Sequence, residues 1–209
     1  MPRAFTEVEK EKIRERLFAA GRSCFTRYGL KKTTIDDLVK PAGIAKSSYY
    51  LFFDSKETLY VELMMVEMPT MMERLIDLSF AATDDTREAL VRLLKAIVYE
   101  IETNEFVRVL LDDPSEVARL AEMLDFEDIL QRSAGMFLPL MQEITKAQER
   151  GEIIPGDPQQ IMYSLGLIKL IPLNRDRLPD ALYQAMLDFI PQVLADGLTC
   201  PTRQRKEDG

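Results

Sequence analysis

The segment TTIDDLVKPAGIAKSSYYLFF, residues 33–53, decides the fold of this chain. It opens with two threonines followed by Ile-Asp-Asp, and hydroxyl side chains ahead of acidic residues are typical of a helix start. The Ala-Gly-Ile sequence at 42–44 predicts a tight turn, and a further short helix is expected over residues 45–52. Two short helices joined by such a turn are a candidate helix-turn-helix motif, whose second helix enters the major groove of DNA.

The second short helix carries side chains that suit a nucleic-acid surface. Lys46, Ser47 and Ser48 begin it, and ammonium and hydroxyl groups can bond to phosphates and base edges. Tyr49 and Tyr50 follow, each with a rigid ring that ends in a hydroxyl. A helix start adds free N–H groups and a partial positive charge, both of which attract phosphate. The alternative, a motif kept only for packing, gives no reason for the lysine and the two serines.

The rest of the chain also shows helical periodicity, so the sequence predicts an all-α fold. Apolar residues recur at helical spacing over residues 8–27, 90–101 and 178–197. Pro69 should end or kink the helix that begins after residue 55, because proline lacks a backbone N–H. A later helix should stop before Pro172.

The composition removes several classes of protein from consideration. The 209 residues include no histidine, so Ser-His and Cys-His catalysis and the commonest metal ligand are absent. No apolar run reaches the roughly 18 residues of a membrane span, and the charged N-terminus is unlike a signal peptide. Two cysteines imply no disulfide framework and fit a reducing compartment. We therefore expect a cytoplasmic protein without membrane contact, enzymatic activity, metal or cofactor.

The net charge of −8 conceals an uneven distribution. Residues 1–60 contain 12 Lys and Arg against 8 Asp and Glu, whereas residues 61–209 contain 15 against 27. A basic first quarter on an acidic remainder indicates two different tasks in one chain, with nucleic acid as the partner of the first. A difference of this size can also arise by chance.

Residues 13–63 resemble the DNA-binding domain of the tetracycline-repressor (TetR) family of bacterial transcription regulators. The resemblance depends on residue type, order and spacing over about 50 positions, and it covers roughly a quarter of the chain. The residues that carry it are Ile13, Ala20, Phe25, Gly29, Thr33, Thr34, Ile35, Asp37, Leu38, Ala42, Gly43, Ile44, Lys46, Tyr50, Phe52, Phe53, Ser55, Lys56, Glu57 and Leu59. The rest of the chain fits the family's variable C-terminal domain only in size and in its helical character.

The resemblance implies a homodimeric repressor that binds a pseudo-palindromic operator and responds to a small-molecule effector. It implies a helix-turn-helix domain over residues 1–54, a helical effector-binding and dimerisation domain over 55–200, and a disordered tail over 201–209. The DNA contacts carried over from the family, together with the neighbouring Tyr49, are Thr33, Thr34, Lys46, Ser47, Ser48, Tyr49, Tyr50 and Lys56. Within this set, Thr34, Tyr50 and Lys56 would bind phosphate, and Ser47 and Ser48, with Tyr49, would read bases.

The sequence departs from the family pattern at four positions. Pro41 should shorten its helix, and Ala45 replaces the usual serine cap, at a cost of about 1 kcal/mol. Ser47 replaces a common glycine, and Phe52 replaces a common tyrosine. These departures concern the operator sequence and the affinity rather than the fold.

Two further sets of residues are expected in the C-terminal domain. Polar or methionine side chains on apolar helices are candidates for an effector pocket: Met68, Met72, Tyr99, Glu102, Arg108 and Tyr163. The resemblance places the dimer interface on the last two long helices, where the candidates are Leu165, Gly166, Leu170, Leu182, Met186, Phe189 and Val193. Ordinary core packing is the alternative for members of both sets. A further alternative is a regulator of the same architecture that a protein partner controls in place of a small molecule.

Overall fold

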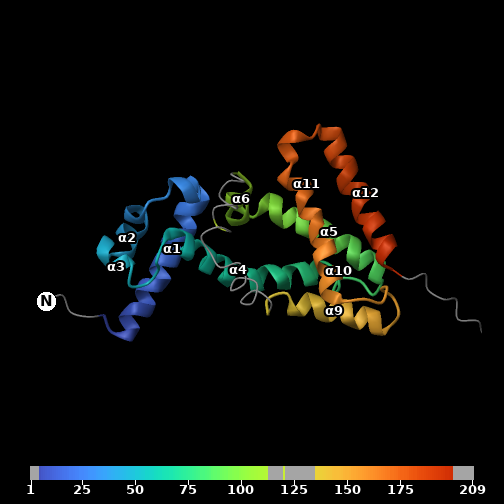
Figure 1. The fold of residues 1–209 in the computed structure, drawn as a ribbon, viewed down its shortest axis with the longest axis horizontal. Helices are drawn as coiled ribbons and strands as arrows, with labels where there is room; N and C mark the ends of the chain where they lie inside the picture. Colours follow the sequence, from blue (N-terminus) through green and yellow to red (C-terminus); the bar gives the residue numbers. More distant parts are fainter. Residues whose placement is uncertain (1–4, 113–119, 121–134, 200–209) are drawn as a thin grey trace, which may run out of the picture. The chain divides into compact units, whose positions relative to one another are not determined.

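The computed structural model describes residues 5–112, Leu120 and residues 135–199. In these ranges the regular secondary structure is helical, apart from an isolated bridge between Ile153 and Thr199, and turns or loops connect the helices (Figure 1). The predicted all-α fold is confirmed. None of the described helices is long and apolar enough to cross a membrane. The expected tail at 201–209 and a helix expected to start at residue 113 lie outside the described residues.

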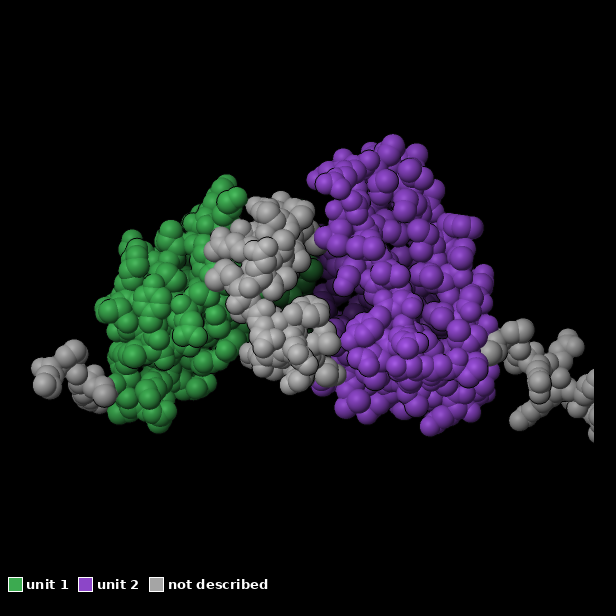
Figure 2. All heavy atoms as spheres, in the orientation of Figure 1, with its two compact units in different colours: residues 1–68, 104–133 green, residues 69–103, 134–209 purple. Residues whose placement is uncertain are grey.

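The chain divides into two compact units (Figure 2). Unit 1 consists of residues 1–68 and 104–133, and unit 2 consists of residues 69–103 and 134–209. The long helix α4, Lys56–Leu78, begins in unit 1 and ends in unit 2. We describe each unit separately below.

Unit 1 contains the helix-turn-helix segment. Its helices are α1 (Glu7–Lys32), α2 (Ile35–Ala42), α3 (Lys46–Tyr49), the first part of α4, and α6 (Glu105–Asp112) (Figure 1). The side chains of Leu17, Phe25, Leu38, Tyr49, Leu59 and Tyr60 are fully buried and form its core with their neighbours. Because these residues come from α1, α2, α3 and α4, the core fixes the two short helices against the two long ones.

Glycines mark the points where the chain of unit 1 turns. Gly29 interrupts α1 with a φ of 77°, a left-handed value that favours glycine. Gly43 ends α2 with φ 71° and ψ 33°, and its N–H donates to the carbonyls of Val39 and Lys40. This left-handed cap satisfies the last carbonyls of α2 and turns the chain directly into α3.

Unit 2 is built around α5, Thr86–Thr103. Its other elements are the end of α4, α9 (Leu138–Glu149), α10 (Pro158–Leu165), η1 (Gly166–Lys169), α11 (Leu170–Leu173), η2 (Arg175–Arg177) and α12 (Asp180–Leu198). Elements η1, α11 and α12 pack against α5. The α5 side chains Leu90, Leu93 and Leu94 are completely buried, so this helix provides the centre of the second core.

Two prolines did not end helices as we expected. Pro41 lies inside α2 and Pro69 lies inside α4, so α2 continues to residue 42 and α4 continues to Leu78. The expected ends at these two prolines were wrong because neighbouring packing can hold a helix together although one backbone hydrogen bond is lost; a kink at Pro69 stays a prediction. The helix that begins at Pro158 ends at Leu165, before Pro172, as expected, and Pro172 lies within α11. Pro172 follows a change from α- to 3-10 geometry over residues 166–169.

Candidate nucleic-acid interface

The start of α3 presents polar side chains to solvent. Ser47 and Tyr50 are exposed, the latter at 55% of its surface, and Ser48 is half-buried. Within the described part of the chain, the hydroxyl groups of these three residues have no hydrogen-bond partner. Polar side chains without internal partners are available to a ligand, so this short surface can donate and accept hydrogen bonds.

Tyr49 does not share this surface. Its side chain is completely buried, and its hydroxyl donates to the Ser55 carbonyl at 3.0 Å. Its ring packs near those of Phe53 and Tyr50. The prediction that Tyr49 reads a base is therefore wrong, since neighbouring helix positions point about 100° apart and only one of the two tyrosines can face outward. Burial also raises the pKa of the Tyr49 hydroxyl well above its usual value.

Thr33 is also buried and is occupied inside the protein. Its hydroxyl donates to the carbonyl of Gly29 at 2.8 Å and approaches that of Cys24 at 3.3 Å. It therefore satisfies carbonyls at the break in α1. The predicted contact between the Thr33 side chain and DNA is wrong for this reason.

Thr34 caps α2 in a reciprocal arrangement with Asp37. The Asp37 N–H donates to the Thr34 hydroxyl oxygen at 3.3 Å, and the Asp37 carboxylate accepts from the Thr34 hydroxyl at 2.6 Å and from the Thr34 N–H at 2.9 Å. These hydrogen bonds lower the pKa of the Asp37 carboxyl. Thr34 is exposed, but its hydroxyl proton already has an acceptor. The signal for this capping box was present in the Thr-x-x-Asp spacing.

Lys46 forms an ion pair that the sequence did not reveal. Its ammonium lies 2.8 Å from the Asp36 carboxylate, which belongs to the first turn of α2. Both side chains are about half exposed. Ten residues separate the partners, so this contact depends on the turn between α2 and α3 and has no local sequence signature.

The Lys56 side chain ties the start of α4 to the end of α1. Its ammonium donates to the carbonyls of Leu30, Lys31 and Thr33 at 2.6, 2.9 and 2.8 Å. An ammonium group has three N–H donors, and all three are directed at these carbonyls. These bonds give Lys56 a positioning role in the free chain, and its predicted contact with phosphate stays a prediction.

The six effector-pocket candidates are distributed over both units, and none of them lines the cavity of unit 2 described below. Met72 belongs to the core of unit 2, and Tyr99 and Tyr163 are exposed. The Glu102 carboxylate accepts a hydrogen bond from the Tyr183 hydroxyl. Met68 is half-buried and Arg108 is exposed, and both belong to unit 1.

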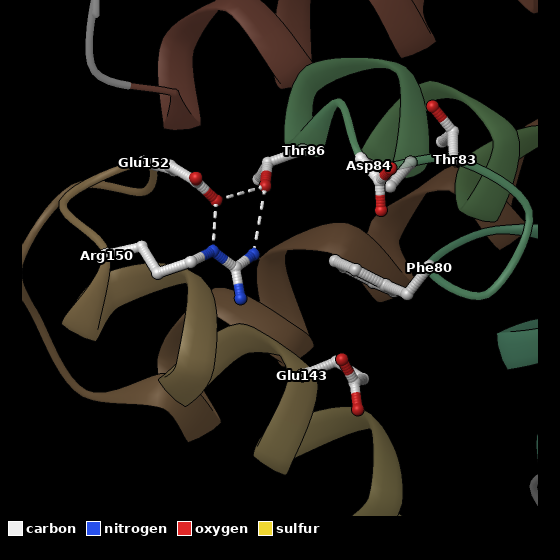
Figure 3. Close-up of a pocket in the computed structure, with 8 residues that line it drawn as sticks. Phe80, Thr83, Asp84, Thr86, Glu143, Arg150 and Glu152 are labelled. Atoms are coloured by element: carbon white, nitrogen blue, oxygen red, sulfur yellow. Dashed lines mark hydrogen bonds and ion pairs between the residues drawn. The ribbon is translucent and has the colours of Figure 1, made fainter.

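A cavity of about 400 Å³ in unit 2 is lined by other residues (Figure 3). They are Phe80, Thr83, Asp84, Thr86, Ala89, Glu143, Arg150 and Glu152. The Glu152 carboxylate accepts from the Thr86 hydroxyl at 2.6 Å and from Arg150 at 2.7 Å, and the first of these bonds contributes most to lowering its pKa. The lining is polar, and no periodic pattern in the sequence pointed to it, because its members come from loops and from the two helices α5 and α9.

The dimer-interface candidates divide into exposed and buried residues. Leu170, Leu182, Phe189 and Val193 are exposed, the phenylalanine at 68% of its surface. Leu165 is buried in the core of unit 2, so its side chain is not available on the free surface. Met186 and Gly166 are half-buried, and a Cβ atom added at Gly166 would meet no neighbour within 4 Å. The exposed leucines, phenylalanine and valine form the apolar surface of α11 and α12.

In the part of the chain that the structure describes, no group of acidic and cysteine side chains is arranged to hold a metal ion. Cys24 is buried, its thiol approaches the Asp37 carbonyl at 3.7 Å, and burial raises the pKa of this thiol. A buried thiol with a raised pKa is a poor nucleophile, so its role is in packing.

Comparison with known proteins agrees with this geometry. Residues 17–63 match the family of bacterial regulatory proteins named the tetR family. An uncharacterized HTH-type transcriptional regulator of Bacillus subtilis (strain 168), YhgD, is 24% identical over 153 residues, which are 73% of this chain and 76% of that protein.

Solved structures share the fold over nearly the whole chain. A TetR-family transcriptional regulator from Pectobacterium atrosepticum has a TM-score of 0.72 at 22% identity, covering 94% of this chain and 99% of that one. The structure of RolR in complex with resorcinol has a TM-score of 0.64 at 14% identity, covering 94% and 99%. The matched segment contains α2, α3 and the exposed hydroxyls of Ser47, Ser48 and Tyr50. Residues 17–63 therefore match the tetR family of bacterial regulatory proteins, and the described chain shares its fold with solved structures of regulators named as members of that family.

Proposed function

We propose that this protein is a homodimeric repressor that binds a pseudo-palindromic DNA operator and is released from it by a small-molecule effector. The observation that carries the DNA-binding part is the exposed start of α3, where the hydroxyls of Ser47, Ser48 and Tyr50 lack partners within the described protein. In a helix-turn-helix protein these positions face base edges and phosphates.

The proposed contacts divide by chemistry. Ser47 and Ser48 are short, so they reach base edges only if α3 lies deep in the major groove. The Tyr50 hydroxyl and the Lys46 ammonium are the proposed phosphate ligands. Thr33, Tyr49 and Lys56 support the motif from inside the protein. This division predicts that base preference depends on the serines and that general affinity depends on Tyr50 and Lys46.

The DNA-binding proposal is tested by selecting duplexes from a random pool and measuring their affinity at several salt concentrations. We expect a recovered sequence with two related half-sites about 10 base pairs apart, or a multiple of that distance. Affinity should fall steeply with salt, because phosphate contacts release counterions. No enriched sequence, and no measurable affinity even at low salt, would contradict the proposal.

The apolar surface of α11 and α12 supports the dimer. Leu170, Leu182, Phe189 and Val193 are all exposed in the single chain, and exposed apolar side chains on neighbouring helices favour burial in an interface. Two copies that associate through this surface would present two α3 helices to the same duplex, as a pseudo-palindromic operator requires.

Replacing Leu170 and Phe189 together by glutamate should convert the dimer to monomers. Each change would bury an unpaired carboxylate in the interface, and we expect the dissociation constant to rise by at least about 100-fold. Sedimentation velocity at micromolar concentration would measure the change. Leu78→Glu is the matched control, because Leu78 is similarly exposed on α4 and lies outside the proposed surface. A wild-type protein that sediments as a monomer, or a double variant that remains dimeric, would contradict the assignment.

We place the effector in unit 2. RolR, which shares the fold, has been solved with resorcinol, and unit 2 contains a cavity of about 400 Å³. That volume lies within the range of roughly 300–1,000 Å³ that small-molecule sites occupy. A compound that binds the protein and lowers its affinity for the selected operator would support this part. Release that requires a second protein and no small molecule would contradict it.

A further inference from the structure

The ion pair between Lys46 and Asp36 lies on the surface that is proposed to meet DNA. Lys46 is the first residue of α3 and Asp36 is the second residue of α2, so both belong to the first turns of the two short helices. The Lys46 ammonium is 2.8 Å from the Asp36 carboxylate. This hydrogen bond is the largest cause of a raised Lys46 pKa.

The two neighbouring acids of α2 have different roles. Asp37 completes the capping box with Thr34 and thereby begins the helix. In the described residues, the Asp36 side chain makes its hydrogen bond and its ion pair to Lys46. Because both partners are about half exposed, this pair adds little to stability. Asp36 also lies in the first turn of α2, where a negative charge favours the helix start, so its contribution to stability comes from this position more than from the ion pair.

An acid at this position has a direct consequence for DNA binding. The Asp36 carboxylate and a DNA phosphate are both anionic oxygen acceptors, and they compete for the Lys46 ammonium. Lys46 must therefore leave Asp36 before it can bind a phosphate. Asp36 then remains close to the phosphate, and like charges within a Debye length of about 8–10 Å repel each other. Both effects weaken binding, and neither depends on the base sequence.

We propose that Asp36 is an internal competitor of the DNA phosphate: it holds the Lys46 ammonium in the free protein and lowers the affinity of the protein for DNA of every sequence. The inference rests on the proposed DNA-binding function and adds a residue that limits it. Base discrimination by Ser47 and Ser48 is unaffected, because the competition concerns only the backbone contact. The expected consequence is a shorter residence time of the protein on non-specific DNA.

The test measures binding of the full-length protein to the selected operator and to a scrambled duplex, at about 0.15 M salt and at several other concentrations. Asp36→Asn should bind both duplexes about three- to tenfold more tightly, as expected for one exposed ion pair and one removed repulsion. The slope of log affinity against log salt should become steeper by up to about one. Thermal unfolding should change little.

A double-mutant cycle separates this mechanism from a general charge effect. In a Lys46→Gln background, Asp36→Asn should give a smaller gain than in the wild type, because only the repulsion between Asp36 and the phosphate is then removed. Asp54→Asn is the charge-matched control, because Asp54 is an exposed acid between α3 and α4 and is not a member of the Lys46–Asp36 pair. It should change affinity less than Asp36→Asn does. Asp36→Glu keeps the charge and should remain close to the wild-type affinity.

Several results would overturn the proposal while leaving DNA binding itself intact. One is a wild-type protein that binds its operator and an Asp36→Asn variant that binds no more tightly. Another is an equal gain in the wild-type and Lys46→Gln backgrounds. A third is a gain confined to the operator, which would give Asp36 a part in base selection. A wild-type protein that binds no DNA would instead contradict the proposed function.

Discussion

Replacing Arg74 by methionine should lower the free energy of unfolding by about 3 kcal/mol. Arg74 on α4 donates two hydrogen bonds to the Glu100 carboxylate on α5, both at 2.8 Å. Glu100 is 7% exposed, so the change would leave a carboxylate buried beside the core of unit 2 without its bidentate partner. Removing one member of a buried pair costs about 3–5 kcal/mol, and the half-exposed Arg74 side chain places this case at the lower end.

Denaturant unfolding followed by circular dichroism would measure this effect. Arg92→Met is the matched control, because Arg92 pairs with Glu88 on the exposed side of α5 and such a pair is worth only about 0.3–0.5 kcal/mol. Arg74→Met combined with Glu100→Leu should recover much of the lost stability, since no buried charge remains. Equal effects of the two single arginine changes would show that the Arg74–Glu100 pair is not buried as described.

Replacing Lys56 by methionine should cost about 2 kcal/mol of stability and weaken binding to every DNA sequence. Methionine keeps the apolar stem but leaves the carbonyls of Leu30, Lys31 and Thr33 without the ammonium that they bind. Hydrogen bonds to charged groups contribute about 1.5–3 kcal/mol. The effect stays within this range for three bonds because the bond to the Lys31 carbonyl is exposed. The junction between the end of α1 and the start of α4 would then be loosened, and α2 and α3 would be misplaced.

The salt dependence distinguishes this positioning role from a phosphate contact. If Lys56 only holds the junction, the slope of log affinity against log salt should stay at the wild-type value in Lys56→Met. A direct phosphate ligand would lower the magnitude of that slope by about 0.9. Lys40→Met serves as the control for loss of one exposed positive charge from unit 1. Unchanged stability together with a reduced slope would contradict the positioning role.

The sequence was informative where local chemistry decides the structure. The Thr34 hydroxyl and the Asp37 carboxylate predict the start of α2. Gly43 predicts the left-handed turn that leads to α3. These features depend on backbone hydrogen bonds within a few residues. The helical periodicity of α5 was equally clear, because this helix has buried side chains at regular spacing along its length.

The sequence was less informative where distant segments decide which atoms are free. Tyr49 and Lys56 have suitable chemistry for DNA, but burial and the carbonyls of α1 occupy them. A signal for Tyr49 was present: Phe53 lies four residues later, so the two rings fall on the same side and pack together. The Lys46–Asp36 pair had no such signal, because its distance depends on the angle between two helices.

Base reading by α3 is tested by selecting operators with the wild-type protein and with Ser48→Ala in parallel. We expect both proteins to recover related sequences, with a changed preference at one position in each half-site. Each base-edge contact contributes about 1–3 kcal/mol of discrimination, so the change should be visible in the selected pool. An identical preference for the two proteins at every position would contradict the claim.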